Sequence, residues 1–210
     1  LLARQRQDFL AAGSPDAKIR IDRLRRAHDL LSIYEQEICD ALMSDYGHRS
    51  KDQTFFVELM TTAKPLRLAM KKVRKWMRPE HRSAGFPFNA AGARAEVRHE
   101  ALGVVGIISP WNFPINLTFT PLAGVLAAGN RAMIKPSEHT PATSELMKQM
   151  FASAFDETEI AVVTGGPDVA ASFSALPFDH LLYTGGERVA KSVMRAAAEN
   201  LVPLTLELGG

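Results

Sequence analysis

The sequence has few of the features that mark secreted, membrane and nucleic-acid-binding proteins. It contains one cysteine, Cys39, in 210 residues, which excludes an intrachain disulfide and points to a reducing compartment. No uninterrupted apolar run is long enough to cross a bilayer, and no charged-then-apolar leader with a small-residue cleavage site is present. We therefore expect a cytoplasmic protein with no membrane partner.

Neither sign of charge dominates. The 25 Lys and Arg residues against 23 Asp and Glu residues give a net charge of +2, and the basic residues do not gather beside aromatic ones, so we expect no nucleic-acid partner. The densest basic stretch, residues 71–78, alternates with apolar positions at helical spacing, which favours the solvated face of a helix over an anion-binding patch. The overall composition is that of an ordinary globular protein.

The N-terminal residues have helical periodicity. Apolar residues at three-, four- and seven-residue spacings predict an amphipathic helix from Asp16 to Tyr46, with Ser14-Pro15 as its start signal and Gly47 as its stop. A second pattern, residues 51–77, predicts another helix with a bend at Pro65. The residues expected to be buried in this second helix are Phe55, Leu59, Met60, Leu66, Met70 and Val73.

The composition changes to Gly, Pro, Ala and Asn between Ser83 and Gly92, and residues 95–100 then alternate polar and apolar as an exposed strand does. This is the clearest boundary in the sequence. We divide the chain into an N-terminal helical segment, residues 1–82, a linker with a bridging strand, residues 83–100, and a third part, residues 101–210.

The third part alternates short apolar runs with helical patterns. The runs are 104–109, 132–135, 160–164, 180–183 and 203–208, and the helical patterns are 115–128, 142–155, 168–176 and 187–200. This alternation predicts an α/β fold with a Rossmann-like parallel sheet covered by helices on both faces. Ligands of such sheets bind at the carboxyl ends of the strands, so the residues that follow each run are the functional candidates.

Two prolines flank a single carboxamide after the first run, in Pro110-Trp111-Asn112-Phe113-Pro114. Rigid backbone on both sides would hold Asn112 as a preorganised hydrogen-bond donor to a developing oxyanion. Equally, Asn112 would serve as the cap of the helix that starts near Pro114. Local chemistry does not separate these two interpretations.

Lys135 and Glu138 follow the second run in Lys135-Pro136-Ser137-Glu138, where they would reach ribose hydroxyls as donor and acceptor. Taken alone, the string favours the alternative, an exposed salt bridge with a capping serine.

Glycines precede two of the helical patterns. Thr184-Gly185-Gly186-Glu187 leads into a helix whose first amides would bind an anion such as a pyrophosphate, and a simple glycine-rich turn is the alternative. Gly165-Gly166-Pro167 has the same two interpretations, with the turn favoured. The sequence contains no Gly-x-Gly-x-x-Gly, which argues against an ordinary Rossmann dehydrogenase.

Glu207 lies in the last apolar run, directly before Leu208-Gly209-Gly210. A carboxylate is costly to bury there, so we expect a raised pKa and the role of a general base, with a hydrogen-bonded structural Glu as the alternative. Cys39 lies beside Ile38 in the predicted first helix, which is typical of a buried structural thiol. No metal site is expected.

These strings occur in an order that resembles the aldehyde dehydrogenase superfamily: Pro-Trp-Asn-Phe-Pro, Ala128-Gly129-Asn130, Lys-Pro-Ser-Glu-His-Thr-Pro, Tyr-Thr-Gly-Gly and Leu-Glu-Leu-Gly-Gly. The resemblance is strong over residues 100–210 and looser before them. Residues 162–166 and 179–185 look like the dimeric class 3 branch of the superfamily and, within it, the bacterial coniferyl aldehyde dehydrogenases.

The resemblance implies a reaction and a role for each matched residue. A cysteine thiolate would attack an aldehyde, hydride would pass to NAD(P)⁺, and the thioester would be hydrolysed to the carboxylic acid. Asn112 would form the oxyanion site, Glu207 would activate the water, and NAD is favoured over NADP because Glu138 would repel a 2′-phosphate. The implied cofactor-binding residues are Ser109, Pro110, Trp111, Lys135, Ser137, Glu138, Gly166, Thr184, Gly185, Gly186, Val189 and Leu208.

The sequence departs from this family in two ways. Where relatives usually have Gly-Ser-x-x-Val-Gly at the pyrophosphate helix, this chain has Gly185-Gly186-Glu187-Arg188-Val189-Ala190, which lacks the serine hydroxyl and places an acid near the phosphates. The nucleophilic cysteine would lie beyond Gly210. The chain also begins without Met, so we expect an N-terminal portion of a longer enzyme, inactive alone, with the bridging strand at 95–100 joining a homodimer. The alternatives are a non-catalytic nucleotide-binding or interaction module and an acyl-phosphate reductase; Asn112 together with Glu207 argues against the latter.

Overall fold

The computed structural model describes residues 1–209, and its N-terminal part is helical. Two expectations for this part are corrected. The helix expected over residues 16–46 is two helices that meet at Tyr34, and Asp16 rather than Ser14 caps the first of them by accepting a hydrogen bond from the Ile19 amide. An additional helix precedes both. The elements are α1 Leu2–Ala12, α2 Ala17–Ile33, α3 Glu35–Tyr46, α4 Lys51–Gln53, the π-helix η1 Thr54–Met60, and α5 Thr61–Trp76.

The second helical region contains a π-helical turn that the sequence pattern did not reveal. α5 runs through Pro65 without interruption, and η1 lies directly before it. A π-helical turn holds more residues than an α-helical turn and so changes which residues face inward. As a result Phe55 and Met60 are 40% and 48% exposed, contrary to expectation, while Glu58 is fully buried.

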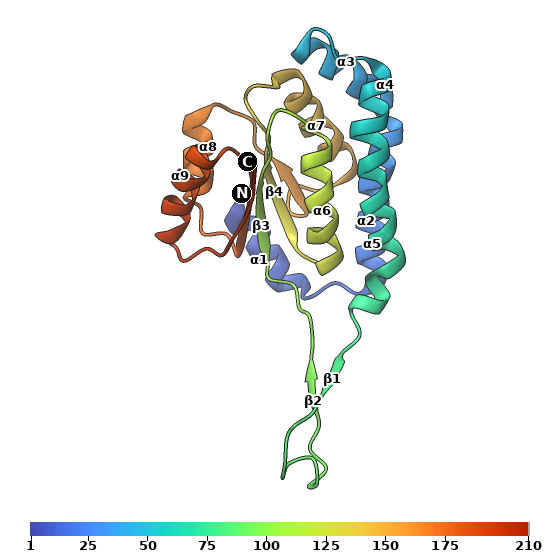
Figure 1. Ribbon diagram of the computed structural model, residues 1–210, viewed down its shortest axis with the longest axis vertical. Coiled ribbons are helices and arrows are strands. Elements are labelled where there is room, and N and C mark those ends of the chain that lie inside the picture. The colour runs from blue at the N-terminus through green and yellow to red at the C-terminus, as the bar shows by residue number, and fades with distance from the viewer. Residues whose placement is uncertain (210) are drawn as a thin grey trace.

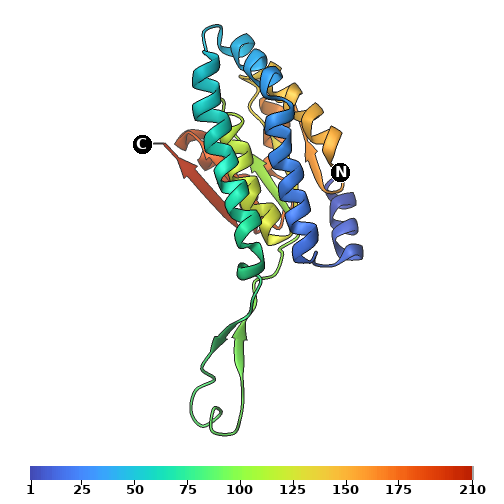
Figure 2. The same cartoon turned by 90° about the vertical axis from the view of Figure 1, so that its right-hand side faces the viewer.

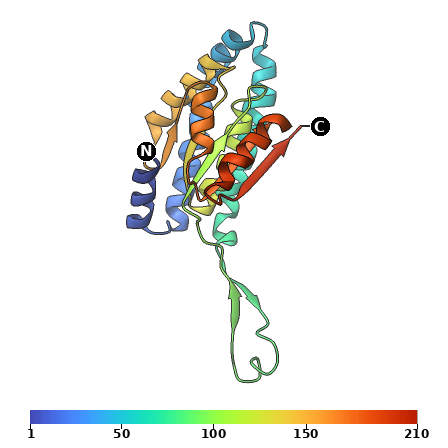
Figure 3. The ribbon, with the colours of Figure 1, turned by 90° about the vertical axis from the view of Figure 1, so that its left-hand side faces the viewer.

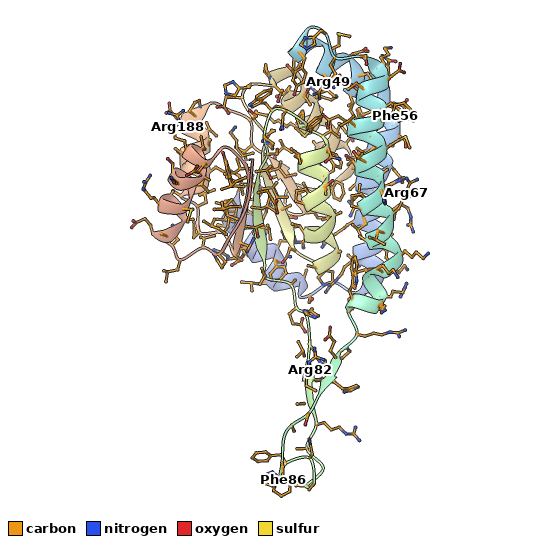
Figure 4. All side chains as sticks on the ribbon, viewed as in Figure 1. Arg49, Phe56, Arg67, Arg82, Phe86 and Arg188 are labelled. Atoms are coloured by element: carbon orange, nitrogen blue, oxygen red, sulfur yellow. The ribbon has the colours of Figure 1, made fainter. Side chains whose placement is uncertain are left out.

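A two-stranded antiparallel hairpin follows α5. β1 Glu80–Arg82 pairs with β2 Ala95–Val97, and the hairpin extends away from the body of the molecule, with Phe86 90% exposed at its tip (Figures 1 and 4). The exposed strand expected at 95–100 is thus present but shorter. Residues 80–82, assigned from the sequence to the helical segment, are a strand, because Pro79 disfavours the helical conformation of the residue before it and ends the helical region.

The remaining strands form one parallel sheet, as predicted. Their order across the sheet is β5-β4-β3-β6-β7. The chain first adds β4 and β5 on one side of β3 and then adds β6 and β7 on its other side. The strands are β3 Val104–Ile108, β4 Arg131–Lys135, β5 Ile160–Val162, β6 His180–Gly185 and β7 Leu204–Leu208, and the helices between them are α6 Asn116–Ala128, α7 Pro141–Ala154, α8 Pro167–Ser174 and α9 Glu187–Ala198.

Helices cover both faces of this sheet, as expected. α6 and α7 pack on one face with α2 and α5 outside them (Figure 2), whereas α1, α8 and α9 lie on the other (Figure 3). Alternate residues of β3 therefore enter different cores: Val105 and Ile107 pack with α6, while Val104 and Ile108 pack with α9. Such strict alternation is the expected result of the two-residue period of a strand.

Side-chain hydrogen bonds and ion pairs connect the N-terminal helices to the residues of the sheet domain. The Gln5 amide donates to the carbonyls of Ala132 and Glu157. Arg23 of α2 donates to Glu159 at 2.8 Å, and Arg26 donates to the same carboxylate at 2.9 Å. The helical segment is therefore an integral layer of the sheet domain. Over residues 1–209, no helix combines the length and hydropathy needed to span a bilayer.

Candidate functional site

A cleft of about 600 Å³ opens at the carboxyl ends of β3, β4 and β6. Its position is the one expected for ligands of a parallel sheet, beside the strand at which the order of connections reverses. Most of the residues proposed from the sequence to bind a cofactor line it, although they come from separate segments of the chain. These residues are Ser109, Pro110, Trp111, Lys135, Ser137, Glu138, Thr184, Gly185, Gly186 and Val189.

Two proposed residues lie outside the lining of the cleft, Gly166 and Leu208. Gly166 is the N-cap of α8, and a Cβ built on it would meet nothing within 4 Å. Gly165 beside it has a φ of +147°, and a Cβ built on it would lie 2.6 Å from the Val169 side chain, so only glycine fits there without displacing a neighbour. Leu208 is exposed on β7.

Lys135 is the buried cation of the cleft. Its side chain is only 1% exposed, its ammonium donates to the Pro136 carbonyl at 2.6 Å, and the Glu138 carboxylate lies 3.8 Å away. Burial lowers the pKa of Lys135, and the nearby Glu138 partly opposes that shift. The string alone favoured an exposed salt bridge. That interpretation is wrong for the lysine, since its side chain is buried and its charge depends on the nearby acceptors.

The N-terminus of α9 meets the opposite side of the cleft. Gly186 is its N-cap and no side chain of residues 1–209 caps this end of the helix, so the first amides are available to an anion. A side chain at Gly185 would displace a neighbour, since a Cβ there would lie 2.3 Å from the Tyr183 hydroxyl. The backbone thus approaches the cleft without an intervening side chain.

The unusual acid at this helix points away from the cleft. Glu187 forms an exposed i,i+4 ion pair with Lys191 at 2.5 Å and is not among the lining residues. Arg188 does line the cleft. Of the two charged residues at the start of α9, the one that lines the cleft is thus the positive one, and the acid expected near the phosphates is not among the lining residues.

Small side chains on α8 and α9 make room for the cleft, and sequence reasoning missed them. They recur every three or four residues on each helix, which places them on one face. This spacing of Ala and Ser was the available signal. The residues are Ala170, Ala171, Ser174, Ser192 and Ala196.

Asn112 is exposed in the loop between β3 and α6, next to the cleft-lining Trp111. Its side-chain oxygen accepts a hydrogen bond from the Phe113 amide at 3.1 Å. It does not cap α6, since that helix begins at Asn116, whose amide donates to Glu58. The capping interpretation of Asn112 is therefore wrong.

Glu207 lies on β7 opposite Thr184 of β6, one of the residues that line the cleft. Contrary to expectation the Glu207 side chain is exposed. The reason is that β7 is the edge strand of the described sheet, so the apolar run around Glu207 is only partly covered. Burial within residues 1–209 thus gives no support to its assignment as a base.

Cys39 lies elsewhere, on α3. It is 7% exposed, and burial raises the pKa of its thiol. A raised pKa makes a thiol less reactive, which fits a structural cysteine. No group of three or more potential metal ligands occurs among residues 1–209.

Comparisons with known proteins give a consistent result. The model of the "Aldehyde dehydrogenase family" matches residues 3–210. The chain is 55% identical over 211 aligned positions to a "Probable coniferyl aldehyde dehydrogenase" of Caulobacter vibrioides and 52% identical over 209 to a "Coniferyl aldehyde dehydrogenase" of a Pseudomonas strain. It is covered completely in both alignments but spans only 44% and 43% of those proteins.

Solved structures agree with the sequence comparison. A substrate-bound aldehyde dehydrogenase of Staphylococcus aureus superposes with a TM-score of 0.92 at 35% identity, covering 99% of this chain and 45% of that one. An NAD⁺ complex of a Mycobacterium tuberculosis aldehyde dehydrogenase superposes with a TM-score of 0.86 at 27% identity, covering 100% of this chain and 43% of that one.

Proposed function

Because the chain belongs to the aldehyde dehydrogenase family, we propose that the intact protein oxidises an aldehyde to a carboxylic acid with a nicotinamide cofactor. The observation that carries this proposal is the cleft at the strand ends, which collects the side chains expected to hold the cofactor. The 210 residues correspond to less than half the length of the curated relatives, so the activity is proposed for the intact protein.

The cleft has the donors and acceptors that a dinucleotide requires. Lys135 and Glu138 would bind ribose hydroxyls, and the first amides of α9 would bind the pyrophosphate. We propose NAD rather than NADP as the preferred form, because the Glu138 carboxylate would repel a 2′-phosphate. The nicotinamide, when bound, supplies the hydride acceptor. Gly166 and Leu208, outside the lining, are the weakest of the proposed cofactor residues.

Asn112 and Glu207 are the proposed catalytic residues. The Asn112 amide group would donate to the oxyanion formed when a thiolate adds to the aldehyde. Glu207 would take a proton from the water that hydrolyses the thioester, and its register opposite the cleft residue Thr184 supports a position near the reaction. The thiolate belongs to a cysteine other than Cys39, whose buried helical position excludes it from the cleft.

We propose an aromatic, coniferyl-type aldehyde as substrate, on the basis of the two relatives described above. Dimerisation through the β1–β2 hairpin, which extends from the body of the molecule (Figure 1), is a further part of the proposal. The cytoplasmic location expected from the sequence stays a prediction.

The test is the reduction of NAD⁺ and NADP⁺ by the intact protein with coniferyl aldehyde, compared with an aliphatic aldehyde. We expect reduced nucleotide and the corresponding carboxylic acid in equal amounts, and no turnover from residues 1–210 alone. Nucleotide binding without oxidation of either aldehyde would instead favour the non-catalytic nucleotide-binding module. A failure to bind nucleotide would overturn both proposals.

A further inference from the structure

The loop that carries Asn112 is held by the N-terminal helices. Tyr46, at the end of α3, donates from its hydroxyl to the Trp111 carbonyl. Arg49, in the turn between α3 and α4, donates to the Asn112 carbonyl at 2.8 Å. Two successive carbonyls of the loop thus have partners 65 and 63 residues away in the sequence.

Glu58 of η1 holds the other end of the same loop. One oxygen of its carboxylate accepts the Asn116 amide at 2.8 Å, where α6 begins. The other oxygen accepts from Arg49, also at 2.8 Å. Arg49 and Glu58 therefore bridge the two ends of the segment between Asn112 and Asn116.

The Arg49–Glu58 ion pair is buried and in contact with aromatic rings. Glu58 is fully buried and Arg49 is 8% exposed. The guanidinium carbon lies 4.1 Å from the centroid of the Tyr46 ring and 5.2 Å from that of Phe113, so cation–π contacts oppose its rotation. Figure 4 shows Arg49 at the end of the molecule where α3 meets the loops from the strands.

A buried ion pair contributes little net free energy to folding, because the cost of removing both charges from water offsets their attraction. Here both side chains have a second bond. That of Arg49 ends on the Asn112 carbonyl within the loop, and that of Glu58 ends on the Asn116 amide, where the loop joins α6. The pair therefore acts on the geometry of the loop.

The orientation of the Asn112 carboxamide depends on that geometry. Its oxygen is occupied by the Phe113 amide, which leaves the nitrogen as the group able to donate outward. A loop that shifts by about 1 Å would change where this donor points, and displacement of that size costs roughly 100-fold in rate.

We propose that Arg49 and Glu58 are positioning residues that hold the Asn112 carboxamide in the orientation required to bind an oxyanion. This inference rests on the proposed role of Asn112 in aldehyde oxidation. The variants Glu58→Gln and Arg49→Lys keep the approximate size of each side chain while removing the charge or the planar fork. Glu159→Gln is a matched control, because Glu159 also bonds an Arg at 2.8 Å but touches no part of the loop.

The test is a double-mutant cycle in the intact protein with Asn112→Ala. If Glu58 acts only through Asn112, then Glu58→Gln should lower kcat/KM by about tenfold to 100-fold in the parent, yet cause no further loss in the Asn112→Ala background. The nucleotide Kd should change by a smaller factor than kcat/KM. Arg49→Lys should behave in the same way. Glu159→Gln should show neither effect, even where it lowers thermal stability.

Fluorescence supplies a readout that does not require activity. Trp111 lies next to Asn112 in the loop, and comparing each variant of the intact protein with its Trp111→Phe counterpart isolates the emission of this tryptophan. Glu58→Gln should make Trp111 more accessible to acrylamide quenching, and Glu159→Gln should not.

Each outcome is informative. Losses that add fully to that of Asn112→Ala, or Trp111 quenching identical to that of the control, would overturn the positioning role. If Asn112→Ala itself retains full activity while the quenching changes as expected, the loop contacts stand and the proposed oxyanion role fails. If Glu58→Gln does not fold, Arg49→Lys carries the same cycle.

Discussion

The carboxylate of Glu58 accepts a hydrogen bond of 2.8 Å from the main-chain amide of Asn116, although the two residues lie 58 positions apart in the sequence. Glu58 takes the place of a local helix cap for α6, whose own N-terminal residues supply none. A single buried side chain thus joins the N-terminal helices, through Arg49, to the first helix of the sheet domain.

Glu58 should make stability depend on pH. Burial raises its pKa to about 7, against the opposing influence of the Asn116 amide and the Arg49 guanidinium. Because the folded pKa is above the unfolded value of 4.5, the group favours folding below pH 4.5, and this contribution is lost as pH rises through 7. Between these two pH values the free energy of unfolding should fall by about 3 kcal/mol on account of Glu58.

The measurement is denaturant unfolding of the parent and of Glu58→Gln between pH 4 and pH 8. The glutamine of this variant cannot ionise, so the variant should gain free energy of unfolding relative to the parent across this range, whatever its constant offset. Other titrating groups cancel in the difference. A difference that stays flat between pH 4.5 and pH 7 would show that Glu58 titrates normally.

The sheet was predictable from sequence and the N-terminal contacts were not, for a physical reason. Strands such as Val104–Ile108 are short apolar runs bounded by Gly or Pro, so their signal is local. The bonds of Arg49 and Glu58 to the Asn112 loop join residues distant in sequence, and η1 alters the periodicity that would have identified Glu58 as buried. No local pattern contains that information.

The residues of the candidate site also divide into those that a local sequence pattern predicts and those whose environment depends on the topology of the fold. Lys135 and Gly185 were identified because strand ends and glycine turns are local features. The exposure of Glu207 depends on whether β7 lies at the edge or in the middle of a sheet, which is a property of topology. Its expected burial was therefore wrong even though its strand was predicted correctly.

Glu138 should determine the choice between NAD⁺ and NADP⁺. Its carboxylate lies 3.8 Å from the Lys135 ammonium and lines the cleft. Glu138→Gln removes the charge that would repel a 2′-phosphate and leaves Lys135 to attract it, so NADP⁺ should bind roughly tenfold more tightly relative to NAD⁺. The ratio of the two Kd values by titration calorimetry checks this. Ser137→Ala, which alters no charge, is the control, and an equal ratio in both variants would contradict the role of Glu138.

Gly185 and Gly186 should differ in their tolerance of a methyl group. A Cβ at Gly185 would lie 2.3 Å from the Tyr183 hydroxyl, whereas one at Gly186 meets nothing within 4 Å. Gly185→Ala should displace the Tyr183 ring, cost about 1–3 kcal/mol and distort the cleft. Gly186→Ala should leave the thermal midpoint nearly unchanged. Equal stability of the two variants would show that Tyr183 moves aside without cost.

Glu207 is best tested by separating the two halves of the proposed reaction. A base that only activates water is needed for thioester hydrolysis and not for the preceding hydride transfer. In the intact protein, Glu207→Gln should therefore lower steady-state turnover by about 100-fold or more while the first burst of reduced nucleotide keeps its amplitude. Stopped-flow absorbance of the nucleotide measures both in one experiment. Thr205→Val, two residues earlier on β7, is the control for damage to the strand. If burst and steady state fall together in Glu207→Gln but not in the control, Glu207 acts before hydrolysis, and the general base must be sought elsewhere in the protein.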